Sequence, residues 1–119
     1  MLTLSMVENK TGYFLLSVYQ YDGVTPQNLV GSTLYFHAAY GSNFAINKSS
    51  PSTGITITNP AGGLNCATLQ IDPADTAALN LPLPAQIAMA CELSMTDPSG
   101  HTWELDSGQL LIAPNVGTP

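Results

Sequence analysis

The chain has 119 residues, a length typical of one domain, and its 45% hydrophobic content is sufficient for a single core. Only 8% of the residues are charged, and two lysines without any arginine leave a formal net charge of -6. Because so few cations cannot neutralise a row of phosphates or bind an anionic lipid surface, we expect neither nucleic acid nor a membrane as a partner.

The first ten residues, MLTLSMVENK, are expected to form an N-terminal arm. The arm has no basic leading region, and polar residues interrupt its apolar stretch at positions 8–10, so we expect no secretion signal. Two roles stay open for it: a segment that docks on a partner, or a strand added to the chain's own sheet. The side chains available for either contact are Met1, Leu2, Leu4 and Met6.

Two strands are predicted in the next part of the chain. The run YFLLSVYQY, Tyr13–Tyr21, is rich in aromatic and apolar residues and ends at a turn-forming DG pair. The run LVGSTLYFHAAY at 29–40 alternates apolar and polar side chains, which predicts a half-buried strand. Its core face consists of Leu34, Phe36 and Ala38.

Three shorter strands are expected in the middle of the chain. SNFAIN at 42–47 is a candidate edge strand, and the loop-forming stretch KSSPSTG follows it. GITIT at 54–58 and LNCATLQI at 64–71 both alternate and are separated by a Gly-containing turn, so we expect them to form a strand pair. The core side chains of the second are Ala67, Leu69 and Ile71.

One short helical segment is predicted at DPADTAALN, where Asp72 occupies a cap position and Pro73 the first helical position. We expect one or two turns. LPLP at 81–84 is expected to be a connector, because neither proline has an N–H to donate to a strand ladder.

The longest alternation, IAMACELSM, begins the C-terminal part of the chain. It predicts a strand whose core face consists of Ile87, Met89, Cys91, Leu93 and Met95. Cys66 is then expected on an outer face while Cys91 points inward, so we expect two free thiols.

A hairpin is predicted around DPSG. A five-residue loop at 97–101 pairs Met95 with Trp103 and Leu93 with Leu105, which places Trp103 in the core. A second turn is expected at DSG, 106–108, before the last apolar run. On the solvent face this register pairs Ser94 with Glu104 and Glu92 with Asp106.

About seven to eight short strands separated by turns, with one short helical turn near Asp72–Leu79, are typical of an antiparallel sandwich. We therefore predict an all-β chain with an immunoglobulin-like antiparallel β-sandwich. Residues 11–115 are expected to form the single domain, after the arm at 1–10 and before a tail at 116–119.

The residues that carry chemistry favour no enzyme. For nucleophilic catalysis only His37 and His101 are available as the base, and neither accompanies a nucleophile motif. Glycosidase chemistry needs paired carboxylates in a cleft, whereas the candidates Glu92, Glu104, Asp97 and Asp106 are expected on an open sheet face. The cysteines and histidines lack zinc-ligand spacing, so we expect no metal centre and no cofactor. Two weak calcium candidates stay open. One is Glu92 with Asp106, for which the alternative is a solvated acidic face. The other is the turn at 72–75, for which the alternative is a helix cap.

Five tyrosines exceed what one small core needs, and tyrosine-rich surfaces with few charges suit protein interfaces. Tyr19, Tyr21 and Tyr40 are therefore interface candidates, with scattered exposure as the alternative.

Five segments follow one another in a pattern that resembles a known family. They are the G-x-x-L-x-F strand at 31–36, the G-I-x-I strand at 54–57, the D-T-x-x-L turn at 75–79, the E-L-x-x-T-D-x-x-G hairpin at 92–100 and the G-x-L-x-I-x-P strand at 108–114. The order is similar to the small β-sandwich family of tailed-bacteriophage structural proteins, which includes the N-terminal domain of baseplate upper proteins and related tail-fibre or neck components.

This resemblance implies a non-enzymatic virion component of a tail, baseplate, neck or fibre adaptor, assembled in the bacterial host cytoplasm. It implies partners among other virion proteins and a homo-oligomer, without catalytic residues. A capsid-surface decoration protein is an alternative. The alternative from another class is a glycan-binding, adhesin-like module that would use exposed tyrosines, including Tyr35.

Overall fold

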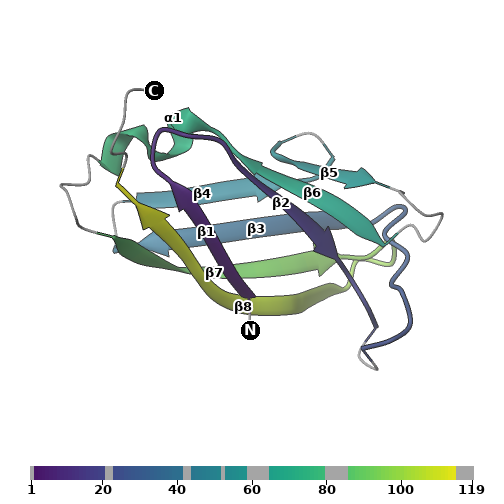
Figure 1. Cartoon of the computed structure of the whole chain (residues 1–119). Coiled ribbons are helices and arrows are strands. Elements are labelled where there is room, and N and C mark those ends of the chain that lie inside the picture. Colours follow the sequence, from purple (N-terminus) through teal and green to yellow (C-terminus); the bar gives the residue numbers. More distant parts are fainter. Residues whose placement is uncertain are drawn as a thin grey trace.

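The computed structural model describes residues 2–20, 23–41, 44–51, 53–58, 65–79 and 86–114. Within these residues, eight strands form two sheets, and one short helical segment lies between the sixth and seventh strands (Figure 1). The elements in chain order are β1 (Leu2–Val7), β2 (Gly12–Ser17), β3 (Thr33–Tyr40), β4 (Phe44–Ser49), β5 (Ile55–Thr58), β6 (Cys66–Ile71), α1 (Pro73–Thr76), a 3₁₀ turn (Ala77–Leu79), β7 (Ile87–Thr96) and β8 (Thr102–Ala113).

The five-stranded sheet has the order β1-β8-β7-β3-β4, and the three-stranded sheet has the order β2-β6-β5. The fold is therefore mostly β, as predicted, with the expected short helical turn after Asp72. One pair departs from the fully antiparallel prediction, because β1 lies parallel to β8. These strands come from distant parts of the chain, so no tight hairpin dictates an antiparallel pairing between them.

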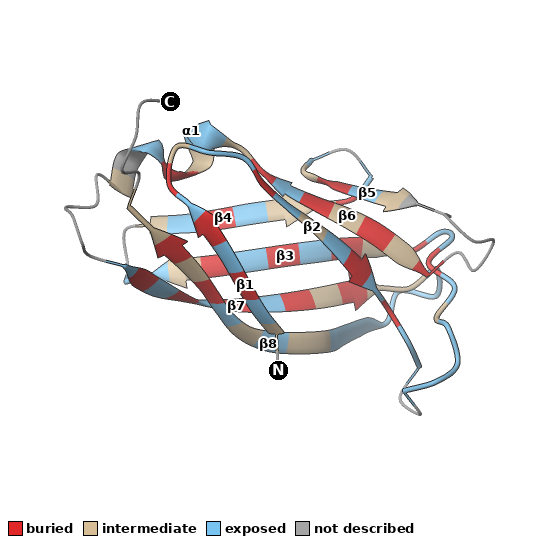
Figure 2. Cartoon of the chain, viewed as in Figure 1, coloured by how far each residue is buried: buried red, intermediate tan, exposed pale blue. Residues whose placement is uncertain are grey.

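Buried side chains from both sheets form one hydrophobic core. The alternation predicted for β3, β6 and β7 is confirmed, and Figure 2 shows buried and exposed segments alternating along β3. The largest fully buried apolar side chains are Phe36, Leu29, Leu34, Ile55, Leu69, Ile71, Met89, Leu110 and Ile112.

The N-terminal arm forms a strand of the chain's own sheet, which is the second of its two expected roles. Leu4 and Met6 of β1 are buried in the core, and Leu2 is partly buried against it. Gly108 of β8 permits the close approach of β1, because a Cβ at this position would lie 1.8 Å from the Leu2 carbonyl oxygen. Of the segment expected at 1–10 as an arm or added strand, Leu2–Val7 belong to the sheet; Met1 lies outside the described residues.

The β7–β8 hairpin confirms part of the predicted register. Met95 lies opposite Trp103, and Ser94 lies opposite Glu104. A bulge between Leu93 and Ser94 then shifts the pairing, so the predicted partnership of Leu93 with Leu105 is wrong.

The predicted turn at 106–108 is wrong as well. The pairing of β8 with β7 continues through these positions, and β8 is a single 12-residue strand. The extra residue of the bulge is Leu105, and the three residues predicted as a turn are all paired with β7.

The first predicted strand is shorter than expected. β2 ends at Ser17, and Tyr19 forms an isolated bridge with Pro26 beyond it. The predicted strand pair at 54–71 is confirmed as β5 and β6. The LPLP connector, Tyr21 and the tail at 116–119 lie outside the described residues.

Candidate functional site

Trp103 is exposed, so its predicted place in the core is wrong. It lies opposite the buried Met95, which puts it on the core side of the sheet, yet 53% of its surface is exposed. Trp103 is the second residue of β8, at the hairpin end of the sheet. The residues across from it, Tyr19 and Gln27, follow the end of β2 and leave the indole partly uncovered.

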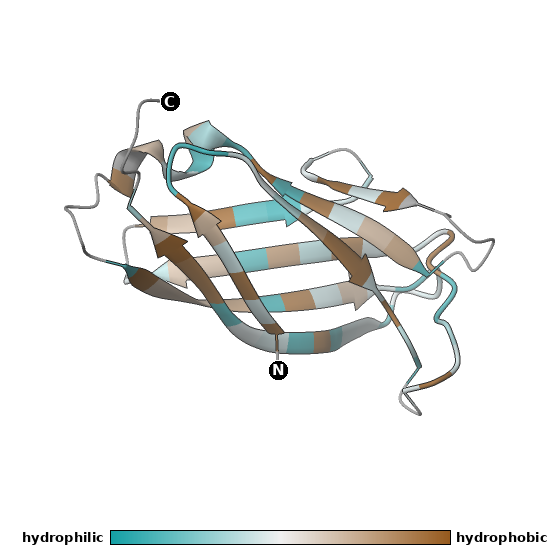
Figure 3. Cartoon of the chain, viewed as in Figure 1, coloured by the Kyte–Doolittle hydropathy of each residue, from teal (hydrophilic) through white to brown (hydrophobic). Residues whose placement is uncertain are grey.

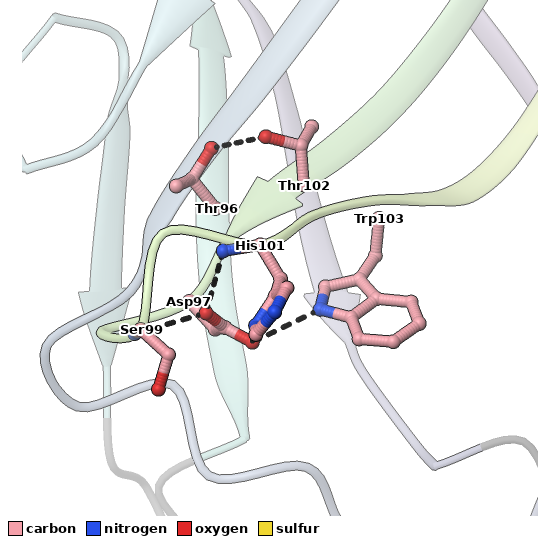
Figure 4. A network of polar contacts seen from close by, with 6 residues as sticks. All are labelled: Thr96, Asp97, Ser99, His101, Thr102 and Trp103. Atoms are coloured by element: carbon pink, nitrogen blue, oxygen red, sulfur yellow. Dashed lines mark hydrogen bonds and ion pairs between the residues drawn. The ribbon is translucent and has the colours of Figure 1, made fainter.

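The Asp97 carboxylate holds the hairpin loop and the indole together. One carboxylate oxygen, Oδ1, accepts hydrogen bonds from the backbone N–H groups of Ser99 (3.0 Å) and His101 (2.9 Å). The other, Oδ2, accepts one from the Trp103 indole N–H at 3.1 Å. Figure 4 shows the carboxylate between these three donors, with Trp103 on the side away from Ser99.

These contacts favour the ionised form of Asp97. The Trp103 hydrogen bond, followed by that of the His101 backbone, holds the pKa of the carboxyl below its ordinary value. The His101 ring lies with Nδ1 3.6 Å from Asp97 and its centroid 6.3 Å from the Trp103 ring. His101 is therefore a loop residue beside the indole.

We define the aromatic groove as the concavity of about 450 Å³ beside this hairpin. Its lining residues are Tyr19, Gln20, Gln27, Met95, Asp97, Trp103, Glu104 and Leu105. The segment after β2 supplies one wall because it folds back on itself: the Gln27 N–H donates to the Val18 carbonyl at 3.0 Å, and the Gln20 N–H donates to the Thr25 carbonyl at 2.8 Å. The hairpin supplies the other wall.

A second surface, which we define as the uncharged face, covers the outside of the three-stranded sheet. Tyr13 lies opposite Gln70, and Leu15 lies opposite Thr68. The residues of this face are Tyr13, Leu15, Ser17, Thr56, Cys66, Thr68 and Gln70. The three strands contain no charged residue, and Figure 3 shows β5 in the brown and near-white tones of its isoleucines and threonines.

Tyr13 and Leu15 are the most prominent apolar groups of the uncharged face, with 64% and 66% of their surfaces exposed. Among the tyrosine candidates, Tyr19 and Tyr40 are exposed, as is Tyr35. Sequence analysis missed Leu15, although its alternation with the buried Leu16 was an available signal.

The row formed by His37, Glu92 and Ser107 does not have the geometry of a nucleophile and its base. These residues lie on three adjacent strands, in the order β3, β7 and β8. Two strand spacings, roughly 10 Å, therefore separate the His37 and Ser107 backbones. His37 instead pairs with Asn47 of β4.

The calcium candidates are arranged differently from the sequence prediction. Glu92 lies opposite Ser107 rather than Asp106, so the predicted Glu92–Asp106 pair is wrong, and the bulge is the reason. Asp75 accepts a hydrogen bond from the Asp72 backbone N–H and forms an ion pair with Lys48 at 2.7 Å. The described residues contain no group of three or more His, Cys, Asp or Glu side chains placed to hold a metal ion.

The two cysteines are free and lie on different faces, as predicted. Cys91 is buried, and Cys66 is partly exposed on the uncharged face. Burial raises the pKa of the Cys91 thiol, and the nearby charge of Asp106 raises it further.

No family model matches this chain, and no curated protein matches it either. Within the described part of the chain, no helix is long and apolar enough to cross a membrane.

Proposed function

We propose that this chain is a non-enzymatic structural component of a bacteriophage virion, which assembles through its uncharged face with a second copy of itself. The observation that supports the proposal most directly is the exposure of Tyr13 and Leu15 on a face without charged residues. The place of assembly would be the bacterial host cytoplasm, and other virion proteins would be further partners.

The charge of the chain favours this face over others for self-association. Each copy carries a formal net charge of -6, so contact between most surfaces would bring like charges together. Contact through the uncharged face avoids this repulsion. Exposed tyrosine with depleted lysine and glutamate is also the composition typical of protein interfaces.

The resemblance to small phage β-sandwich proteins supports the virion setting. We also propose that the strands are connected in an immunoglobulin-like way. The chain would be a variant of that fold, because β1 adds to the larger sheet in parallel to β8. The tail, baseplate, neck and fibre-adaptor stations are all compatible with such a module.

The experiment is light scattering of the purified chain over a dilution series, with two matched variants. Leu15→Glu places two like charges against each other in the proposed dimer, so we expect it to yield a monomer. Val24→Glu is the control, because Val24 is exposed and lies outside the uncharged face. A wild-type monomer at all concentrations, or an oligomer that Leu15→Glu leaves intact, contradicts the proposal.

A further inference from the structure

We propose that the aromatic groove binds a neutral oligosaccharide, with the Trp103 ring as the surface on which one sugar residue stacks. This site is separate from the uncharged face, because neither Tyr13 nor Leu15 lines the groove. The inference therefore does not depend on self-association.

The first argument is the exposure and fixed orientation of the indole. An exposed tryptophan normally retains rotamer freedom, which a ligand must restrict on binding. Here the Asp97 carboxylate holds the indole N–H at 3.1 Å while 53% of the side chain stays exposed. The ring is thus both accessible and oriented before any ligand arrives.

The hydrogen bond to Asp97 also determines which part of the indole remains for recognition. Its N–H is already donated, so the ring offers mainly its π face. This face carries partial negative charge, which attracts the partially positive C–H groups on the apolar face of a pyranose ring.

The second argument is the composition of the walls. Tyr19 provides another exposed ring, while the Gln20 and Gln27 amides offer both hydrogen-bond donors and acceptors. Aromatic surface beside a few polar groups, in a concavity of about 450 Å³, is the composition of a small-molecule site.

The third argument is charge. None of the described residues that line the groove is cationic, and two of them, Asp97 and Glu104, are acidic. Anionic ligands such as phosphates or acidic sugars are therefore disfavoured. An organic cation is the remaining competitor, but the Asp97 carboxylate is already engaged by three N–H donors, and the groove offers two aromatic rings rather than a closed cage.

Trp103 is the sole tryptophan, so intrinsic fluorescence reports on this site directly. The test is titration of the whole chain with neutral oligosaccharides of glucose, galactose, mannose and N-acetylglucosamine, alongside a sialylated oligosaccharide and choline chloride. We expect at least one neutral oligosaccharide to change the emission saturably. We expect the sialylated probe and choline to bind more weakly or not at all.

Variants then locate the binding by calorimetry. Trp103→Ala should weaken the affinity for the selected oligosaccharide by at least about tenfold, the factor that corresponds to about 1.4 kcal/mol. Gln27→Ala should weaken it less, and Tyr40→Ala, an exposed tyrosine outside the groove, should leave it unchanged.

Three outcomes would overturn the proposal. They are the absence of saturable binding to every neutral probe at millimolar concentration, preferential binding of choline, and an affinity that Trp103→Ala does not reduce. Circular dichroism of Trp103→Ala separates lost binding from lost folding, and Gln27→Ala provides a second variant if that one does not fold.

Discussion

The Asp97 carboxylate accepts a hydrogen bond from the Trp103 indole N–H, and this contact joins the first residue after β7 to the second residue of β8. The same carboxylate accepts two backbone hydrogen bonds inside the loop. One side chain therefore sets both the conformation of the hairpin loop and the orientation of the exposed indole. The loop and the aromatic groove should respond together when Asp97 changes its charge.

The first prediction concerns pH. The hydrogen bond from Trp103 lowers the pKa of Asp97 from its ordinary value, about 3.9. The stabilisation it provides is complete above the unfolded-state pKa and is lost as the pH falls through the lower, folded-state pKa. We expect tryptophan emission to change as the pH falls below about 4, because protonation weakens the contact with the indole.

Two variants distinguish Asp97 from the nearby carboxyl group of Glu104 on the adjacent strand. Asp97→Asn cannot titrate in this range, so its acid transition in tryptophan emission should be absent. Glu104→Gln is the matched control and should retain the transition. The same acid transition in Asp97→Asn would show that another group controls the indole.

The second prediction concerns the two thiols. Cys91 is buried, and burial followed by the charge of Asp106 raises its thiol pKa, so little thiolate is present at neutral pH. Cys66 is partly exposed. A thiol reagent at pH 7.5 should therefore modify one cysteine of the folded chain rapidly and the second only after denaturation.

Cys66→Ser should abolish the fast phase of this reaction, and Cys91→Ser should leave it unchanged. Mass spectrometry of the modified chain identifies the labelled residue. Rapid labelling of Cys91 in the folded chain would mean that β7 and β8 separate readily at this position.

The alternation of side chains was sufficient to predict most of the strands. Along β7, for example, five alternate apolar side chains are all buried, and the hairpin loop at 97–101 has the predicted length. The bulge at Leu93 and Ser94 was missed although β8 carries a signal for it: the core-side position is odd-numbered at Trp103 and even-numbered at Leu110 and Ile112, a change of phase that one extra residue produces. That single insertion accounts for the wrong pairing of Glu92 with Asp106.

The aromatic groove was not predicted from the sequence, for a different reason. Pairing with Met95 correctly placed Trp103 on the core side of the sheet, but burial depends on what covers that side. The cover comes from Tyr19, Gln20 and Gln27, which are distant in sequence and follow the end of β2 at Ser17. A local pattern carries no information about where a second sheet ends.

The third prediction concerns the pairing of β1 with β8. In Gly108→Ala the added Cβ would lie 1.8 Å from the Leu2 carbonyl oxygen, so β1 must shift or detach. Detachment would expose Leu4 and Met6, and we expect a loss of about 2–5 kcal/mol in the free energy of unfolding, comparable to truncation of a buried side chain.

Urea denaturation measures this loss, with Gln109→Ala as the control at the neighbouring exposed position. The control should stay within about 0.5 kcal/mol of the wild type. Equal stabilities for the two variants would mean that β1 contributes little to the fold.

The last prediction concerns Thr76, which is fully buried and links α1 to the turn between β1 and β2. Its hydroxyl oxygen accepts a hydrogen bond from the Asn9 backbone N–H at 2.9 Å, and the hydroxyl donates to the Pro73 carbonyl at 3.4 Å. Thr76→Val preserves the shape but removes both hydrogen bonds, so the Asn9 N–H loses its acceptor. We expect a loss of about 1 kcal/mol in the free energy of unfolding, the lower end of the usual cost of an unsatisfied buried group, because the Asn9 N–H is only partly buried.

Hydrogen exchange gives a local measurement of the same contact. The Asn9 amide should exchange faster in Thr76→Val, whereas Thr76→Ser, which retains the hydroxyl, should preserve its protection while losing stability only through the missing methyl group. Because Asn9 has a positive φ of 60°, its backbone is held in a conformation that few residues adopt, and the Thr76 hydroxyl is one contact that holds it there. If the Asn9 amide exchanges at the same rate in Thr76→Val as in the wild type, the turn itself, rather than the contact with α1, holds Asn9 in this conformation.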